Sequence, residues 1–436
     1  MTAGLKRELG LVSLAAIVFF NVSGGPYGIE DMVPSFGPGL TLLLLVLTPL
    51  LWSLPVALAM SELASAMPDE GGYVTWTGRA FGPFWAFQVG WWSWLDSFVD
   101  VAIYPALFVE YLRFWMPGMN TLLRWLAALA FIVILTALNL AGVRPTGRAA
   151  VGLGVAALAP VVLFVLVGAA GASARPWTPF AASGDSFGAT LGVGLAVAMW
   201  NYSGWDTPST CLGETRAPER AYRRALWLVL PLITAVYVFP VAVGLSSGTT
   251  DWTRWSTATF PAIARDLGGG ALGHLVAGGA IVAAAGQFMS LLLTNSRLPY
   301  VLARDGLMPA WLGAIHHRFG TPWAAVLVSS GIYALLAIFS FKELVVLSIW
   351  LYSLTLIVEL AAFLWLRVAE PRLARPWRVP GGFAGAVAVA VPPTLFALLA
   401  VATADRVNTI AGVLAALTGP VAYAAFRRAG RRGSRR

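Results

Sequence analysis

The first apolar run of the sequence is interrupted at residues 19–28, which read Phe-Phe-Asn-Val-Ser-Gly-Gly-Pro-Tyr-Gly. Three Gly and one Pro stand here at a depth where a straight membrane helix would need every backbone hydrogen bond. We therefore expect the helix to unwind at Ser23-Gly24-Gly25. The alternative is a kink that only improves packing, since Gly and Pro are common in membrane helices.

A second interruption follows the same pattern at residues 200–208, which read Trp-Asn-Tyr-Ser-Gly-Trp-Asp-Thr-Pro. The motif Asn-x-Ser-Gly occurs at 21–24 and again at 201–204. Five predicted helices separate the two copies, and an odd number makes the second copy enter the membrane from the opposite face. This pattern predicts an inverted repeat in which discontinuous helices one and six form one central site.

The composition is that of a membrane protein. Of the 436 residues, 58% are hydrophobic and 11% are charged, against about 25% charged in soluble domains. A membrane helix needs about 20 apolar residues. The sequence accommodates twelve such windows: 10–36, 39–66, 81–113, 119–140, 148–172, 187–213, 223–247, 273–303, 322–341, 343–368, 383–402 and 406–427. We predict an all-α polytopic membrane protein with twelve transmembrane helices.

The windows form a single domain over residues 1–436. Repeat one covers 10–172, repeat two covers 187–368, two peripheral helices cover 383–427, and 428–436 form a basic tail. Most of the 29 Lys and Arg fall in loops on the side of the two termini. Because positively charged loops resist translocation, both termini are expected in the cytoplasm. The first run lacks an Ala-x-Ala cleavage signature, so it predicts a retained helix of a multi-pass protein in the cytoplasmic membrane.

Several function classes are disfavoured. The net charge of +9 lies in short clusters between apolar runs rather than on one polar face, which argues against nucleic acid. Cys211 is the only Cys, and three His offer no Cys/His spacing, so neither metal nor cofactor is expected. An intramembrane enzyme would need a nucleophile, base or metal that this sequence hardly offers. A channel fits matched broken helices poorly, and a transporter-like sensor would be supported by soluble appendages that are missing here.

Acidic residues lie inside the predicted membrane windows without Lys or Arg at mid-membrane to neutralise them: Glu30, Asp31, Asp96, Asp100, Asp206 and Glu359. Each charge costs at least a few kcal/mol in hydrocarbon, so retained acids usually face a cavity and a partner. They suit two tasks, cradling a cationic substrate and carrying a proton. Glu30, Asp100 and Glu359 are candidates for the substrate, and Asp206, Glu30 and Glu359 for proton coupling. The alternative is that each acid caps a half-helix or bonds to the backbone.

Aromatic and small residues flank both breaks. Rings can close over a substrate or contact an amine by a cation–π interaction, and unwound backbone can hold a carboxylate with its amides. The candidate substrate-binding residues besides the acids are Ser23, Gly24, Gly25, Tyr27, Trp200, Tyr202, Ser203, Gly204, Trp205 and Tyr352. Trp200 stands directly before unwound backbone and is the candidate gate.

Over nearly its whole length the chain resembles the amino acid, polyamine and organocation permease superfamily. The residues that resemble the polyamine uptake transporters of plants and protozoa are 22–31 (VSGGPYGIED), 70–76 (EGGYVTW), 82–107 and 375–380 (RPWRVP). Residues 202–207 (YSGWDT), with Gly213-Glu214 and 218–220, are closer to the L-type amino acid transporters.

This resemblance implies a leucine-transporter-like fold, with an inverted five-helix repeat, two peripheral helices and alternating access. By motif position, Ser23-Gly24-Gly25 match the substrate-facing backbone, Trp200 the gating aromatic, and Asp206 an acid linked to gating or proton coupling. Glu359 matches an acid in span ten of the polyamine branch. Span five lacks the internal Lys of some proton-coupled relatives. The loop after span three has no Cys, so no disulfide-linked heavy chain is expected.

The sequence thus predicts a secondary transporter that moves an amino acid or a polyamine, with protons as the expected coupling ion and substrate exchange as the alternative. The excess of acids favours a polyamine. The Ser-Gly-Gly break favours an amino acid, because a substrate without a carboxylate would leave those amides unpaired. Both substrates remain open at this point.

Overall fold

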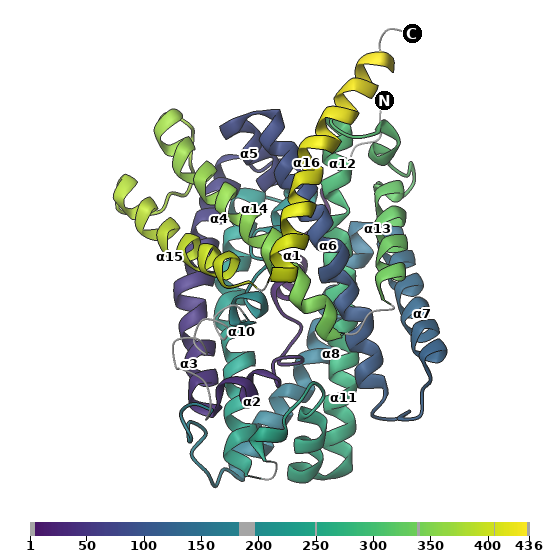
Figure 1. The fold of residues 1–436 in the computed structure, drawn as a ribbon, viewed down its shortest axis with the longest axis vertical. Helices are drawn as coiled ribbons and strands as arrows, with labels where there is room; N and C mark the ends of the chain where they lie inside the picture. Colours follow the sequence, from purple (N-terminus) through teal and green to yellow (C-terminus); the bar gives the residue numbers. More distant parts are fainter. Residues whose placement is uncertain (1–4, 183–196, 249–250, 338–340, 405, 434–436) are drawn as a thin grey trace.

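The computed structural model describes residues 5–182, 197–248, 251–337, 341–404 and 406–433 (Figure 1). Within these ranges the chain is helical and has no strand, only an isolated bridge between Leu9 and Thr215. Eight of the described helical segments are long and apolar enough to cross a membrane: Pro38–Ala66, Thr121–Leu140, Val143–Ala170, Pro218–Ser247, Phe260–Arg304, Trp350–Ala369, Gly382–Thr403 and Arg406–Arg428. The prediction of an all-α, polytopic membrane protein is therefore confirmed at this level.

The first part of the chain consists of α1 (Leu11–Val22), α2 (Met32–Phe36), α3 (Pro38–Thr48), η1 (Pro49–Ser53), α4 (Leu54–Ala66), α5 (Tyr73–Phe81), α6 (Pro83–Leu112), α7 (Thr121–Leu140) and α8 (Val143–Ala170). The segment η1 is a π-helical turn between α3 and α4. It begins at Pro49, which has no N–H to donate to the helix.

The second part consists of η2 (Thr207–Glu214), α10 (Pro218–Ser247), η3 (Trp252–Arg254), α11 (Phe260–Asn295), α12 (Arg297–Arg304), η4 (Ala310–Gly313), α13 (Trp323–Leu336), α14 (Phe341–Ala369), α15 (Gly382–Thr403) and α16 (Arg406–Gly433). Much of the predicted window 187–213 lies outside the described residues. Its described part is a helical end at 197–201 followed by unwound chain and the 3-10 turn η2.

Several helix boundaries differ from those predicted, among them the starts of α8 and α11. Helix α8 begins at Val143, ahead of the predicted start at residue 148, and so includes the basic residue Arg144. Helix α11 begins at Phe260, ahead of the predicted start at residue 273, and bends at Gly269, where φ is 78°. Exposed charged residues near the starts of these helices, among them Arg144 and Arg265, lower the local hydropathy, so hydropathy alone places the starts too late.

The chain unwinds at both predicted breaks. Helix α1 ends at Val22, Ser23 is extended, and Gly25 and Gly28 have φ of 126° and 93°. In the second break Gly204 has φ of 94°. Such positive φ values are easy for Gly and strained for other residues.

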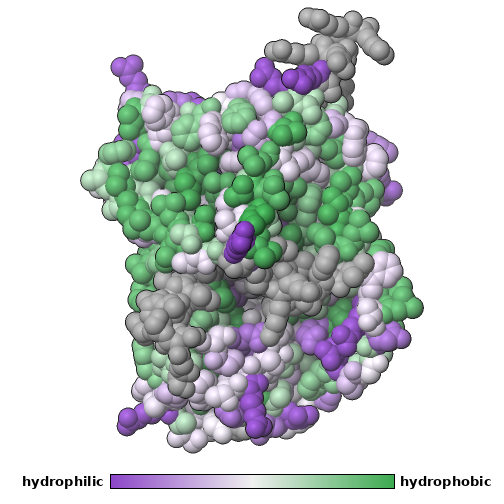
Figure 2. Space-filling model, viewed as in Figure 1, coloured by the Kyte–Doolittle hydropathy of each residue, from purple (hydrophilic) through white to green (hydrophobic). Residues whose placement is uncertain are grey.

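The arrangement encloses α1 at the centre of the molecule, while α15 and α16 lie at its outside (Figure 1). Helix α11 packs on α8 and α6, and α14 packs on α6. Hydrophobic residues cover much of the visible face between its top and the grey band across its middle, and hydrophilic residues gather toward the top and the bottom (Figure 2). The end of α16, α5 and α12 share one end of the molecule (Figure 1), which we call the termini end.

Candidate functional site

The two breaks touch each other at the centre of the molecule. A Cβ atom added to Gly204 would overlap the carbonyl oxygen of Asn21, which ends the last turn of α1. Gly204 therefore combines a positive φ with a backbone contact that leaves no room for a side chain.

The two Asn residues of the repeated motif make the same local interaction. The Nδ2 atom of Asn21 donates to the Ile17 carbonyl at 2.8 Å, and that of Asn201 donates to the Val197 carbonyl at 2.9 Å. Each side chain thus bonds to the last turn of its own broken helix. Asn21 also accepts a hydrogen bond from Thr294 of α11 at 2.8 Å, which ties the first break to that helix.

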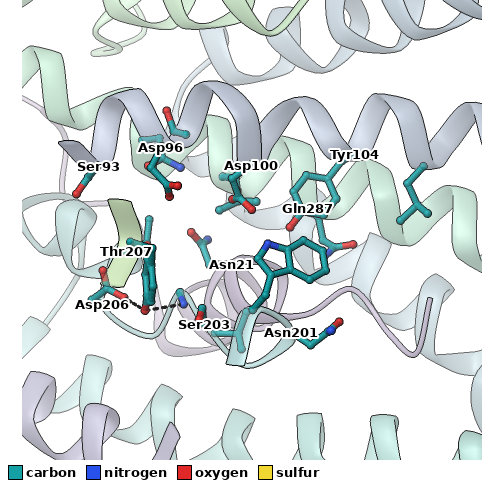
Figure 3. A pocket seen from close by; sticks show the side chains of 18 of the residues that line it. Asn21, Ser93, Asp96, Asp100, Tyr104, Asn201, Ser203, Asp206, Thr207 and Gln287 are labelled. Carbon is teal, nitrogen blue, oxygen red and sulfur yellow. Dashed lines mark hydrogen bonds between the residues drawn. The ribbon is translucent and has the colours of Figure 1, made fainter. Parts of the chain in front are cut away.

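Beside the breaks lies a cavity with about 880 Å³ of empty space, part of it open to solvent. Its walls come from both breaks and from α5, α6, α10, α11 and α14. Three carboxyl side chains line it, those of Asp96, Asp100 and Asp206 (Figure 3). Among the described residues that line the cavity there is no Lys, Arg or His. The cavity is therefore acidic and has room for a small molecule.

One face of α6 supplies a row of polar groups to this cavity. Ser93, Asp96, Asp100 and Tyr104 follow each other along the helix and face the breaks (Figure 3). Asp96 and Asp100 are one helical turn apart, about 6 Å along the axis. The indole of Trp200 donates a hydrogen bond to Asp100. The predicted gate thus contacts one of the predicted substrate-binding acids.

The third acid is fixed by a tyrosine of α14. The hydroxyl of Tyr352 donates to Oδ1 of Asp206 at 2.8 Å and accepts a hydrogen bond from the Gly204 N–H at 3.0 Å (Figure 3). One hydroxyl therefore connects α14, the unwound backbone and the carboxylate.

The amides of the first break already have partners inside the protein. The Gly25 N–H donates to Oγ of Ser23 at 3.1 Å, and the Gly28 N–H donates to Oε2 of Glu30 at 2.7 Å. Glu30 is fully buried, and its other oxygen accepts a hydrogen bond from Tyr111 at 2.9 Å. These two N–H groups therefore do not need a substrate carboxylate as a hydrogen-bond acceptor.

The structure brings eight of the predicted residues to the cavity wall and leaves six elsewhere. The eight are Gly25, Tyr27, Asp100, Trp200, Ser203, Gly204, Asp206 and Tyr352. The six are Ser23, Gly24, Glu30, Tyr202, Trp205 and Glu359. Tyr202 and Trp205 are fully buried in packing, where they donate to the carbonyls of Leu45 and Tyr202 at 2.7 Å each.

Glu359 is unusual among the acids. It lies on α14, its side chain is 1% exposed, and neither oxygen has a hydrogen-bond partner among the described residues. Asp206 is close enough to interact with it electrostatically. A buried, unpaired carboxylate would be very costly, so Glu359 is expected to hold a proton in this conformation.

Sequence reasoning did not select some residues of the cavity wall: Asn21, Tyr73, Ser93, Tyr104, Asn201, Tyr237, Gln287 and Asn295. Asn21 and Asn201 belong to the repeated motif, but the motif was interpreted through its Ser and Gly. Gln287 and Asn295 are polar residues in an apolar run, which is itself a signal of a cavity. The Tyr residues carry no such signal, because a membrane helix buries Tyr for packing as well.

The chain is similar to several known proteins. Residues 9–422 match the model of the family described as amino acid permease. Polyamine transporter PUT1 of Oryza sativa subsp. japonica is 35% identical over 399 residues, which cover 91% of this chain and 74% of that protein. Polyamine transporter RMV1 of Arabidopsis thaliana is 33% identical over 395 residues, covering 90% and 80%. An uncharacterized transporter of Mycobacterium tuberculosis, Rv1999c, is 28% identical over 345 residues, covering 76% and 74%.

Proposed function

Since this chain belongs to the amino acid permease family, and is therefore a transporter rather than an enzyme, we propose that it moves polyamines across the cytoplasmic membrane. The choice of substrate rests on the cavity, which has three carboxyl side chains and no cationic side chain among its described lining residues. A polyamine is a chain of ammonium groups, and such groups need carboxylates or aromatic faces when they leave water. The two named relatives are called polyamine transporters, which supports this substrate.

The spacing of the acids supports a diamine. Asp96 and Asp100 are about 6 Å apart along α6. Two amines joined by four carbons are separated by five bonds, and at about 1.2 Å per bond of an extended chain they span about 6 Å. Each ammonium group of putrescine therefore has a carboxyl partner when the molecule lies along α6. Asp206 extends the acidic wall toward the termini end.

The alternative substrate, an amino acid, has less support from the first break. An amino acid needs donors for its carboxylate, and the Gly25 and Gly28 amides donate to Ser23 and Glu30 instead. No Lys or Arg among the described lining residues replaces them. The family description names amino acids, so amino acids are included in the test.

We propose twelve spans in two inverted repeats, 10–172 and 187–368, with peripheral spans in 383–427 and both termini in the cytoplasm. The equivalent Asn interactions at the two breaks support the repeat. The proposed cycle is alternating access, in which Trp200 over Asp100 closes the end opposite the termini.

We propose protons as the coupling ion and Glu359 as the group that carries them. Its buried, unpaired carboxyl supports this role. Asp206 accepts a hydrogen bond from the Tyr352 hydroxyl and interacts electrostatically with Glu359. A proton that moves between the two acids would therefore change the hydrogen bond between Tyr352 and Asp206, which holds the second break. Glu30 is already bonded to Tyr111 and Gly28 and is the weaker candidate.

The test is uptake into proteoliposomes of labelled putrescine, spermidine, arginine and leucine, with and without a proton gradient directed inward. Putrescine and spermidine are expected to enter, faster with the gradient, while leucine is not. Uptake of leucine without uptake of either amine would replace this proposal by an amino acid permease. Absence of transport for all four compounds would refute the substrate class.

A further inference from the structure

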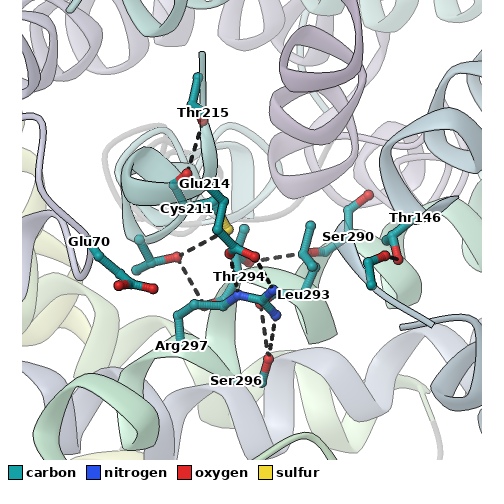
Figure 4. A network of polar contacts seen from close by, with 12 residues as sticks. Glu70, Thr146, Cys211, Glu214, Thr215, Ser290, Leu293, Thr294, Ser296 and Arg297 are labelled. Carbon is teal, nitrogen blue, oxygen red and sulfur yellow. Dashed lines mark hydrogen bonds and ion pairs between the residues drawn. The ribbon is translucent and has the colours of Figure 1, made fainter. Parts of the chain in front are cut away.

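Three chain segments leave the cavity wall and converge at the termini end of the molecule. Tyr73, Thr207 and Asn295 each line the cavity. The same three segments carry the charged residues Glu70, Glu214 and Arg297, respectively. The side chains of these three residues lie close together (Figure 4). Any opening of the cavity toward the termini end must therefore separate or move this group of charges.

We define the gate cluster as Glu70, Glu214, Arg297, Arg304 and Asp305. Its centre is a buried ion pair in which Nε and Nη2 of Arg297 donate to the two oxygens of Glu214 at 2.8 and 2.9 Å. Both side chains are 0% exposed, and Nη1 of Arg297 donates to the Leu293 carbonyl at 2.8 Å. The two parallel hydrogen bonds make a bidentate ion pair, which holds η2 against α12.

The loop before α5 lies directly on η2. The Gly71 N–H donates to the Thr210 carbonyl at 3.3 Å, and the Tyr73 N–H donates to Oγ of Ser209 at 3.3 Å. A Cβ atom added to Gly72 would overlap Ser209. This loop carries Glu70, so the position of the loop and the state of the Glu70 carboxyl are linked.

The gate cluster has more acids than bases. Glu214 is paired with Arg297, and Asp305 accepts from Nε of Arg304 at 2.8 Å. Glu70 is left with one oxygen 3.5 Å from Arg304, while its Oε1 is buried without a hydrogen-bond partner among the described residues. With all three acids ionised, two arginines face three carboxylates. A proton on Glu70 is the simplest way to balance the cluster.

Among the described residues, no other charged neighbour of Glu70 changes this balance. Tyr300 of α12 and Cys211 of η2 interact with Glu70 but are neutral in their ordinary state. Asp69, the preceding residue of the loop, interacts with Arg79. Burial and the nearby Glu214 raise the pKa of Glu70 to about 7, against its ordinary value of 4.5.

We propose that Glu70 is a proton-sensing residue of the gate at the termini end, where the neutral carboxyl keeps the gate shut and its ionisation favours opening. This role of Glu70 rests on the proposed transport function, because the gate is proposed to control the passage of the transported substrate. When the gate opens, water reaches Glu70 and the carboxyl returns to its ordinary acidity. The closed gate therefore binds the proton more tightly, and rising pH between the two pKa values shifts the equilibrium toward the open gate. With the proposed orientation, an alkaline cytoplasm favours release of substrate.

The single Cys of the chain provides a direct test. Cys211 lies in η2 next to Thr210 and is 0% exposed, so a maleimide reaches it only when the gate opens. The labelling rate is measured in nanodiscs from pH 6 to pH 8 for the wild type and for Glu70→Gln, which mimics the neutral acid. Both proteins carry the same thiol, so the ratio of their rates removes its ordinary ionisation. An ionised Glu70 repels the thiolate, which can only slow wild-type labelling at high pH and so works against the expected rise.

The ratio of wild-type to Glu70→Gln labelling is expected to rise about tenfold from pH 6 to pH 8. The matched variant Asp69→Asn should follow the wild type. If Glu70→Gln does not fold, Arg304→Gln serves instead, because loss of this cation should shift the rise to higher pH. A ratio that stays flat, or an unshifted rise in Arg304→Gln, overturns the inference. Since labelling needs no substrate, a flat ratio in protein that takes up putrescine refutes the gate alone, and a rising ratio in protein that transports nothing refutes the transport function alone.

Discussion

Asp100 lies in the cavity wall at the position where one amine of a bound diamine is proposed. Asp100→Asn removes a charged partner, which is typically worth about 1.5–3 kcal/mol for a hydrogen bond to a charged group. The KM for putrescine uptake is therefore expected to rise by roughly 10- to 100-fold. The matched control is Glu110→Gln on the same helix, whose side chain is 38% exposed and pairs with Arg113. Equal losses in the two variants would contradict a role of Asp100 in substrate binding.

Tyr352 holds two partners with a single hydroxyl, the Gly204 N–H and the Asp206 carboxylate. Tyr352→Phe removes both hydrogen bonds and should destabilise the protein by about 1–3 kcal/mol, which a thermal unfolding curve in detergent would reveal. Putrescine uptake per folded molecule should fall as well. Tyr423→Phe is the control, because the Tyr423 hydroxyl accepts an exposed hydrogen bond from Arg427. An unchanged melting temperature for Tyr352→Phe would show that the second break needs no support from α14.

At the scale of elements, the unwound segments decide whether α1 and the second broken helix can meet. Gly204→Ala puts a side chain where φ is 94° and where the Asn21 carbonyl leaves no room. We expect a loss of at least about 1–3 kcal/mol of stability from the backbone strain alone. The control is Gly278→Ala in α11, where an added Cβ meets nothing within 4 Å and helix propensity favours Ala by about 1 kcal/mol. Similar melting temperatures for both variants would contradict the close crossing of the breaks.

The breaks could be predicted because Gly and Pro act locally, through φ and the missing N–H, and so leave a mark in the sequence. The acidic character of the cavity could be predicted for the same reason, from carboxyl groups at membrane depth. The partner of each acid could not. Glu30 accepts a hydrogen bond from Tyr111, and Asp100 accepts one from Trp200. These contacts join distant parts of the chain, and no local pattern encodes them. The 3-10 form of η2 was not predicted either, and the part of the window 187–213 that follows the break was expected to be an ordinary helix.

At the scale of the whole molecule, coupling requires that one proton and one substrate move in the same cycle. Glu359→Gln keeps the shape of the side chain but cannot release a proton. This variant is expected to exchange external labelled putrescine for internal unlabelled putrescine, yet to lose the accumulation driven by an inward proton gradient. Counterflow and gradient-driven uptake, measured on the same proteoliposomes, separate the two activities. Gradient-driven accumulation that survives in Glu359→Gln would exclude this residue as the proton carrier.

We propose that one acidic cavity, built where two broken helices cross, binds a diamine along α6. Equilibrium binding of labelled putrescine to the purified protein, with competition by 1,3-diaminopropane, butylamine and leucine, would test this binding. We expect 1,3-diaminopropane to displace putrescine and leucine to have no effect. Butylamine should displace putrescine at least about tenfold less well, because it engages only one carboxylate. Displacement by leucine, or no binding of putrescine, would contradict it.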